Sequence, residues 1–360
     1  MTDAVATSPY QNLDSRSYWR SGVAERSLHS TSGLYVPRFR ISRKAKIMTA
    51  GSCFAQHVGR TLKAAGFRIL DAEPGANVPA RVLHKYGFGL YSARYGNVYT
   101  ARQMAQLLAE AFDGLTPSDS IWERNGRFYD AFRPSVEPNG HLTPQDVVRH
   151  RQGHLAAVRE LITTLDVFVF TFGLTEAWVS TEDGTVYPTA PGTISGSYDP
   201  EKCVFHNFRY NEVLNDFRAV RKRIRSYNPR AKFIVTVSPV PLTATATGQH
   251  VEVASSYSKS VLRSVCGTLY EDYKDVDYFP SYEVITSQTA RGENFKANWR
   301  SVTSEGVSRA MGLFMQAHDP EYKLEKEDPK PEPESFESAL VKSEDDDLVC
   351  EEALLEAFSK

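Results

Sequence analysis

The sequence predicts an α/β fold, a three-layer sandwich in which a mainly parallel sheet lies between two layers of helices. Two observations carry this prediction. Short, almost wholly apolar segments at 165–172 and 232–237 have the composition of strands that are buried on both faces. Each follows a segment of helical periodicity, at 147–161 and 213–227, and strands that alternate with helices form parallel sheets. The carboxyl ends of such strands meet at one edge of the sheet, where functional residues gather.

The first strand runs into a tight turn and the start of a helix. The apolar run at 47–50 is followed by Gly51-Ser52-Cys53, and apolar residues then recur at helical spacing from Ala55 to Ala65. The amino end of a helix favours negative charge and lowers the pKa of a cysteine placed there. Cys53 is therefore a candidate nucleophile, with Ser52 beside it. The other interpretation is a small residue packed under the turn, as most cysteines are.

Two further strands bring polar residues to the same edge. The strand that ends near 172 delivers Gly173, Thr175 and Glu176, and the strand that ends at 237 delivers Ser238. If the sheet is parallel, these loops converge with the turn at Ser52 and form one site.

The pair Gly96-Asn97 is a turn signal within Tyr95-Gly96-Asn97-Val98-Tyr99. Such a turn can bring a backbone N–H group and a side-chain amide close to a ligand. It can equally be a surface turn that caps a helix predicted at 101–112. The residues alone leave both interpretations open.

The string Gly51-Ser52-Cys53-Phe54-Ala55 resembles the signature of the GSCFA family, a branch of the SGNH/GDSL hydrolase superfamily. Segments at 171–178, 236–242, 257–260 and 278–283 resemble later blocks of that family, in the same order. The resemblance covers about residues 40–316. It implies an SGNH-hydrolase-like sandwich of flavodoxin-related topology, with elaborations between 72 and 150.

The resemblance also implies roles for individual residues. Placing Gly51 on the glycine of the SGNH Gly-Asp-Ser block places Cys53 on the nucleophile, whereas Ser52 as nucleophile would lose two matches. The oxyanion would then be held by the backbone at Cys53, by Asn97 in the Gly96 turn, and by Thr175. Thr175 would donate through a hydroxyl where SGNH enzymes have an amide, and a well-placed donor of either kind contributes about 3 kcal/mol in the transition state.

The last SGNH block, Asp-x-x-His, is matched here by Asn298-Trp299-Arg300-Ser301, which holds neither the acid nor the imidazole. A thiolate formed before substrate arrives needs a base less than a serine does. The leaving group still needs a proton donor, and His250 and Glu176 are the best-placed candidates. His57 and His206 have weaker claims, because their positions in the sequence do not place them at the predicted edge.

Arg300 gives this altered block a positive charge that could bind an anionic ligand. A guanidinium would bind a carboxylate or phosphate, as in an anionic sugar, a phosphorylated acceptor or a phosphopantetheine-type donor. Lys259 and Arg263 lie four residues apart on a predicted helix and either add charge of the same sign or form a solvated helix face.

The charge distribution divides the chain. Residues 319–360 hold 15 acidic and 5 basic side chains, so they carry about −10 while the preceding residues carry about +8. We expect an N-terminal extension at 1–39, one α/β domain at 40–318 and an acidic tail at 319–360. The tail is predicted to be largely disordered, particularly at 325–350, and to be either solvated or folded back on the basic body. A helical pattern at 351–358 offers Leu354, Leu355 and Phe358 as a docking tip for a protein partner.

Composition and sequence patterns also bear on metal binding, membrane insertion, secretion and nucleic-acid binding. The four cysteines have no metal-ligand spacing, no run of apolar residues is long enough to span a membrane, and no secretory pattern opens the chain, so a cytoplasmic protein without a metal is predicted. No nucleic-acid recognition motif is present. No cofactor is required, although a transferase would take an acyl donor such as acetyl-CoA.

The sequence therefore predicts an acyl-ester hydrolase or O-acyltransferase that acts on a carbohydrate or similar small polar ester through a covalent acyl-enzyme. The alternative is a protein that keeps the fold, binds a carbohydrate or another ligand without turning it over, and contacts a partner through its tail. The missing Asp-x-x-His pair favours the alternative, and the Gly51-Ser52-Cys53 turn favours the enzyme.

Overall fold

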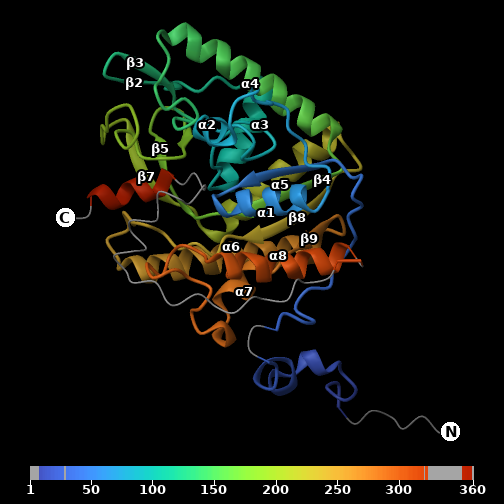
Figure 1. Cartoon of the computed structure of the whole chain (residues 1–360). Helices are drawn as coiled ribbons and strands as arrows, with labels where there is room; N and C mark the ends of the chain where they lie inside the picture. The colour runs from blue at the N-terminus through green and yellow to red at the C-terminus, as the bar shows by residue number, and fades with distance from the viewer. Residues whose placement is uncertain (1–7, 28–29, 320, 323–350, 359–360) are drawn as a thin grey trace, which may run out of the picture.

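The centre of the molecule is a parallel sheet with the strand order β1-β4-β8-β9 (Figure 1). Its strands are β1 (Ile47–Gly51), β4 (Val167–Phe172), β8 (Lys232–Val237) and β9 (Val276–Tyr278). In register, Gly51 lies opposite Thr171, and Thr171 opposite Thr236. The structure is a computed structural model that describes residues 8–27, 30–319, 321–322 and 351–358.

The order of the strands confirms the predicted α/β class. A single parallel bridge joins Ile69 to Ile47 at the outer edge of β1. Counted as the second strand, this segment gives the order 2-1-3-4-5, which is the flavodoxin-like order. In that arrangement the strand order reverses between β1 and β4, and ligands bind beyond the carboxyl ends of the strands at such a switch point.

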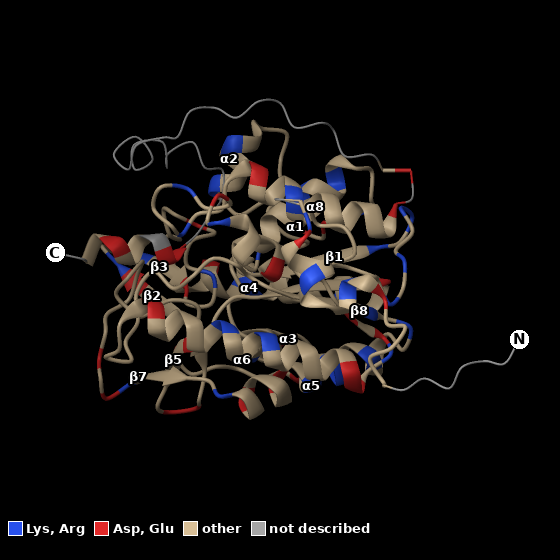
Figure 2. Cartoon of the chain, turned by 90° about the horizontal axis from the view of Figure 1, so that it is seen from below, with Lys and Arg blue, Asp and Glu red and all other residues tan. Residues whose placement is uncertain are grey.

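Side chains alternate between the two faces of the sheet, and each face packs against its own helices (Figure 2). Phe168 and Phe170 belong to the core cluster that includes α3, α4, α5 and α6, whereas Val167 and Val169 pack with α1, α7 and α8. All four side chains are buried. The helices are α1 (Phe54–Ala64), α3 (Ala101–Asp113), α4 (Pro144–Thr164), α5 (Tyr210–Tyr227), α6 (Val251–Asp272), α7 (Ser281–Thr286) and α8 (Ser304–His318).

Two elaborations cover the carboxyl side of the sheet. The first, between Ile69 and α4, holds α2 (Ala80–Lys85), α3 and the hairpin β2 (Ile121–Arg124) and β3 (Arg127–Asp130). The second follows β4 and is an antiparallel sheet of β5 (Glu176–Ser180), β6 (Val186–Tyr187) and β7 (Cys203–Asn207). The sequence predicted the first insertion but not the second.

Segments near both ends of the described chain contact the body, from Arg26 onward at the N-terminal side and through Glu351 at the C-terminal side. Short helical turns at η1 (Ser15–Ser17) and η2 (Arg20–Ala24) precede Tyr35, whose hydroxyl donates to Asp277 at 2.8 Å, and η3 (Gln288–Ala290) follows α7. The helical pattern expected near the C-terminus is the 3-10 helix η5 (Glu351–Phe358). The disorder predicted at 325–350 concerns a segment outside the described residues. Of the helices in the described ranges, none has the length and apolarity to cross a membrane.

The backbones of β1 and β4 approach each other closely at Gly51, and a substitution there tests whether the fold needs this approach. A Cβ atom at Gly51 would lie 2.4 Å from the Thr171 carbonyl oxygen. The backbone of Gly51 has a φ of 142°, which residues other than glycine rarely adopt. We expect Gly51→Ala to lower the free energy of unfolding by about 3 kcal/mol or more. Urea titration followed by circular dichroism measures the change.

Gly153→Ala is the matched control. Gly153 lies on the exposed face of α4 with nothing within 4 Å of an added Cβ. This substitution should raise the free energy of unfolding by about 0.5–1 kcal/mol, because alanine is the better helix former. Equal effects of the two variants would contradict the close approach described here.

Candidate active site

The turn after β1 lies at the switch point of the sheet. The backbone N–H of Ser52 donates to the Thr171 carbonyl at 3.2 Å, and that of Ser238 donates to Phe172 at 2.8 Å. The ends of β1, β4 and β8 are thereby joined side by side. The structure thus brings three of the predicted loops to one edge.

Ser52 and Gly173 are in direct contact across this edge. A Cβ atom added to Gly173 would lie 2.9 Å from the Ser52 Cβ and 3.0 Å from the Tyr99 carbonyl oxygen, so only glycine fits. Ser52 is 3% exposed, and its hydroxyl has no hydrogen-bond partner among the residues that the structure describes. Gly173 accordingly allows the turn, the Tyr99 segment and β4 to meet.

Cys53 occupies the N-cap position of α1 and is buried, with 4% of its surface exposed. The N–H groups of the next turn are bonded at Ala55 to the Ser52 carbonyl (2.8 Å) and at Gln56 to the Cys53 carbonyl (3.0 Å). The thiol therefore lies at the positive end of the helix dipole, as the sequence predicted.

The Gly96-Asn97 turn is buried against the end of β1. The backbone N–H of Val98 donates to the Gly51 carbonyl at 2.9 Å, and Asn97 is 2% exposed. The surface-turn interpretation is therefore wrong, because α3 is capped by Thr100 and Gln103 instead. Gly96 adopts φ 66°, which a glycine accommodates without strain.

The orientation of Asn97 is determined by Tyr91. The Tyr91 hydroxyl donates to Asn97 Oδ1 and also lies 3.2 Å from the Ser52 carbonyl oxygen. The Asn97 Nδ2 group is left to donate outward, and it bonds to Glu351 Oε2 at 2.8 Å. An amide donor is thus presented next to the turn that carries Ser52 and Cys53.

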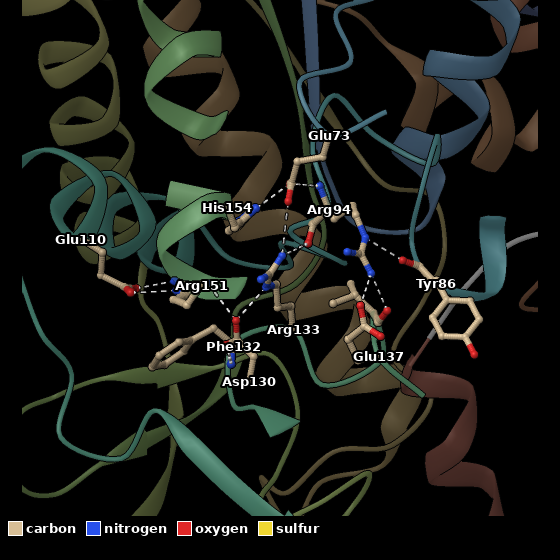
Figure 3. A network of polar contacts seen from close by, with 11 residues as sticks. Glu73, Tyr86, Arg94, Glu110, Asp130, Phe132, Arg133, Glu137, Arg151 and His154 are labelled. Carbon is tan, nitrogen blue, oxygen red and sulfur yellow. Dashed lines mark hydrogen bonds and ion pairs between the residues drawn. The ribbon is translucent and has the colours of Figure 1, made fainter. Parts of the chain in front are cut away.

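A largely buried network of charged groups holds the segment that leads to Asn97 (Figure 3). Glu73 Oε2 accepts from the backbone N–H of Arg94 at 2.7 Å, and Arg133 Nη1 donates to the Arg94 carbonyl at 3.1 Å. The Arg94 side chain in turn binds Glu137 at 2.6 Å. Both backbone groups of Arg94 are therefore bound by ionic side chains, three residues before Asn97.

The same network extends into α4. His154 Nδ1 lies 2.7 Å from Glu73 Oε2, and Arg151 binds Glu110 at 2.7 Å. Burial alone would raise the pKa of Glu73, but it is lowered to about 2 by the hydrogen bond from His154, by the charge that His154 carries in the acid range, and by Arg133. Burial and the charge of Arg133 lower the pKa of His154 to about 4. At neutral pH His154 is therefore uncharged, with its Nδ1–H group donating to the Glu73 carboxylate.

The position of Lys259 decides between the two alternatives that the sequence left open for this residue. It is 4% exposed, and its ammonium donates to the Gly173 carbonyl at 2.6 Å, so the solvated helix face is wrong for this position. Burial lowers the pKa of Lys259 to about 8, against the opposing influence of Glu352 and Cys53. Arg263, one turn later, pairs with Glu283 at 2.5 Å, away from Gly173.

Arg300 comes to the same region through a turn formed by its neighbours. Asn298 Oδ1 accepts from the backbone N–H groups of Arg300 (3.1 Å) and Ser301 (2.9 Å), and Asn298 Nδ2 donates to Ser301 Oγ. Trp299 within this turn has φ 54° and is 70% exposed. Arg300, Lys259, Trp299 and His250 line a cavity of about 670 Å³.

The candidate proton donors Glu176 and His250, and the candidate oxyanion donor Thr175, make other contacts in this structure. Glu176 accepts from the Thr245 hydroxyl at 2.7 Å, and burial raises its pKa. His250 is exposed and caps α6, accepting from the backbone of Glu252 at 3.3 Å. The Thr175 hydroxyl donates to Asn207 at 2.7 Å, so its proton is not directed at Ser52 or Cys53 in this structure.

The remaining histidines of the prediction lie elsewhere. His206 pairs with Glu212 at 2.9 Å on β7, and His57 contacts the Phe54 ring. No group of three or more His, Cys, Asp or Glu side chains within the described ranges is arranged to hold a metal ion.

The sequence of residues 46–314 matches the family model described as the GSCFA family. The chain belongs to the GSCFA family. The match covers the whole parallel sheet, both elaborations and every predicted site residue. A comparison with curated proteins finds no match.

Two solved structures are distantly similar to this GSCFA protein. One is a carbohydrate esterase family 3 protein from Talaromyces cellulolyticus, with a TM-score of 0.34 and 13% identity, covering 75% of this chain and 94% of that chain. The other is an acetyl esterase mutant with an acetate ion, with a TM-score of 0.34 and 13% identity, covering 77% and 99%. Both are too distant to bear on the chemistry of the site.

The ionic network gives the protein a pH-dependent stability. A group whose pKa is lower in the folded state stabilises the fold above its unfolded pKa, and this contribution is lost as the pH falls. For His154 the loss runs from about pH 6.5 to 4, and for Glu73 from about pH 4.5 to 2. Between pH 7 and 4.5 His154 should account for a loss of about 2 kcal/mol.

Urea unfolding of the wild type and of His154→Gln at pH 7 and 4.5 isolates this contribution. The glutamine keeps a donor for Glu73 and does not titrate. The variant should be less stable at pH 7 but should lose about 2 kcal/mol less than the wild type on acidification. An identical loss in both proteins would show that His154 is not held neutral.

Proposed function

We propose that this protein hydrolyses or transfers the O-acyl group of a carbohydrate or similar polar ester through a covalent acyl-enzyme. The observation that carries the proposal is the position of the Lys259 ammonium: it is buried on the Gly173 carbonyl at the switch point, near enough to Cys53 at the amino end of α1 for the two charges to interact. A buried amine whose pKa lies near 8 exchanges a proton close to neutral pH, which is what a general acid and base must do. It supplies the proton transfer that the missing Asp-x-x-His pair would supply.

The proposed reaction uses groups that lie around this pair. A cation beside a thiol and the amino end of a helix both favour the thiolate, so Cys53 Sγ is the preferred nucleophile over Ser52 Oγ. Attack forms the S–C bond, and the oxyanion is held by the Asn97 amide and the backbone at Cys53. The C–O ester bond then breaks, and the Lys259 ammonium gives its proton to the departing alcohol.

The second half returns the enzyme to its starting state. Water or a sugar hydroxyl attacks the thioester, neutral Lys259 takes the proton, and the acid or the new ester leaves with Cys53 regenerated. His250, on the wall of the 670 Å³ cavity, is the alternative proton donor. A second cavity of about 200 Å³ is lined by Trp178 and Glu176, which offer an aromatic face and a hydrogen-bonding carboxylate to a sugar ring.

Variants at the turn test the nucleophile. Cleavage of 4-nitrophenyl acetate should fall about a thousandfold or more in Cys53→Ala. It should stay within about tenfold of the wild type in Ser52→Ala, because that hydroxyl has no partner to lose. The reverse ranking would make Ser52 the nucleophile. Absence of turnover in all forms, including the wild type, would favour a ligand-binding protein.

The role of Lys259 has its own test. Lys259→Met should slow the alkylation of Cys53 by iodoacetamide at pH 7 by about tenfold and move the midpoint of its pH profile upward. Arg263→Met is the matched control on the same helix, because Arg263 pairs with Glu283 instead of facing Gly173. Equal rates in the two variants would remove Lys259 from the proposed mechanism.

A further inference from the structure

The C-terminal segment η5 lies on the candidate site, beside β5 and β7 (Figure 1). The carboxylate of Glu351 accepts from the Asn97 amide (2.8 Å), the Tyr99 hydroxyl (3.1 Å) and the Ser135 hydroxyl. Glu351 is only 3% exposed. The body of the protein therefore offers three converging donors to one carboxylate, and one of them is the amide that we propose for the oxyanion.

The next residue engages the positive charges of the same site. Glu352 pairs with Arg300 at 3.2 Å, with both side chains 13% exposed, and its charge acts on Lys259. The carboxylate of Glu351 thus accepts from three neutral donors, and that of Glu352 interacts with the two cations Arg300 and Lys259. This arrangement has the composition of a site for an acidic ligand.

Two of the three residues predicted as a docking tip make little apolar contact with the body. These two, Leu354 and Phe358, are 48% and 68% exposed. Leu355 alone lines a cavity, the one of about 200 Å³, together with both glutamates. Glu356 lines the 670 Å³ cavity, so η5 borders this cavity as well as the one of about 200 Å³.

We propose that the candidate site takes a ligand with closely spaced carboxylates, and that Glu351 and Glu352 occupy its place as an intramolecular competitor. The proposal deepens the proposed function, since the ligand would be the acidic polar part of the acyl ester. Removing a carboxylate from water costs several kcal/mol unless donors replace the water. The donors at Asn97, Tyr99 and Ser135 do so for Glu351 and would do so for a ligand that displaces it.

A pair of reagents that differ in charge tests the proposal on the full-length protein. Iodoacetate and iodoacetamide alkylate the same thiol, and peptide mass spectrometry follows the reaction at Cys53 alone. In Glu351→Gln/Glu352→Gln both reagents should react faster than with the wild type. The ratio of the iodoacetate rate to the iodoacetamide rate should rise about tenfold, because Lys259 and Arg300 are no longer neutralised.

Three controls accompany this variant. Glu201→Gln/Glu321→Gln removes two charges at exposed positions away from the site and should leave both rates at the wild-type values. Adding Arg300→Gln to the double variant should reverse the rise in the ratio. An acetylated and amidated peptide of residues 351–358, added to the double variant, should slow alkylation, whereas the same peptide with Gln-Gln at its start should not.

Each outcome decides one part of the proposal. Unchanged rates in Glu351→Gln/Glu352→Gln would show that η5 does not cover the site. Faster rates with an unchanged ratio, or equal protection by both peptides, would overturn the preference for acidic ligands. Because alkylation needs no turnover, these results stand even where 4-nitrophenyl acetate is not cleaved. Ester cleavage that the double variant leaves unaltered would overturn the competitor while keeping the proposed enzyme.

Discussion

The candidate site depends on one close backbone approach, between Gly51 at the end of β1 and Thr171 in β4. The bare Cα of Gly51 lets the two strands stay paired up to their last residues. The Gly51 carbonyl then accepts from Val98, and the following turn brings Ser52 against Gly173. Two glycines with no room for a side chain therefore set the positions of the nucleophile turn, the Asn97 turn and the loop after β4.

The segment that carries Asn97 is positioned mainly by charge. Glu73 and Arg133 bind both backbone groups of Arg94; Arg133 is buried, Glu73 is partly buried, and the two side chains pair with each other. A buried ionic network is a weak source of net stability, but losing one member leaves an uncompensated charge and is strongly destabilising. The arrangement therefore suits a role in orientation: it specifies one conformation of a long insertion in which regular secondary structure is sparse.

Local patterns of apolar residues were enough to predict the fold. Contacts between residues far apart in the sequence could not be predicted from such patterns. The strands at 165–172 and 232–237 were recognisable because buried parallel strands are continuously apolar. The sequence left open whether Lys259 lies at the site or on a solvated helix face, since nothing in its neighbourhood reveals that the Gly173 carbonyl lies beside it. The sequence likewise left open whether the acidic tail is solvated or folded back, because the partners of Glu351 and Glu352, at Asn97 and Arg300, are far away in the sequence.

The turn around Trp299 has a practical consequence. Its indole is largely exposed at the wall of the 670 Å³ cavity, while Trp178 lines the smaller cavity on the β5 side. Indole emission shifts with the polarity of its surroundings, so each cavity carries its own optical reporter. Single Trp→Phe replacements would assign a change in intrinsic fluorescence to one cavity or the other, and occupancy of the site could be followed without any label.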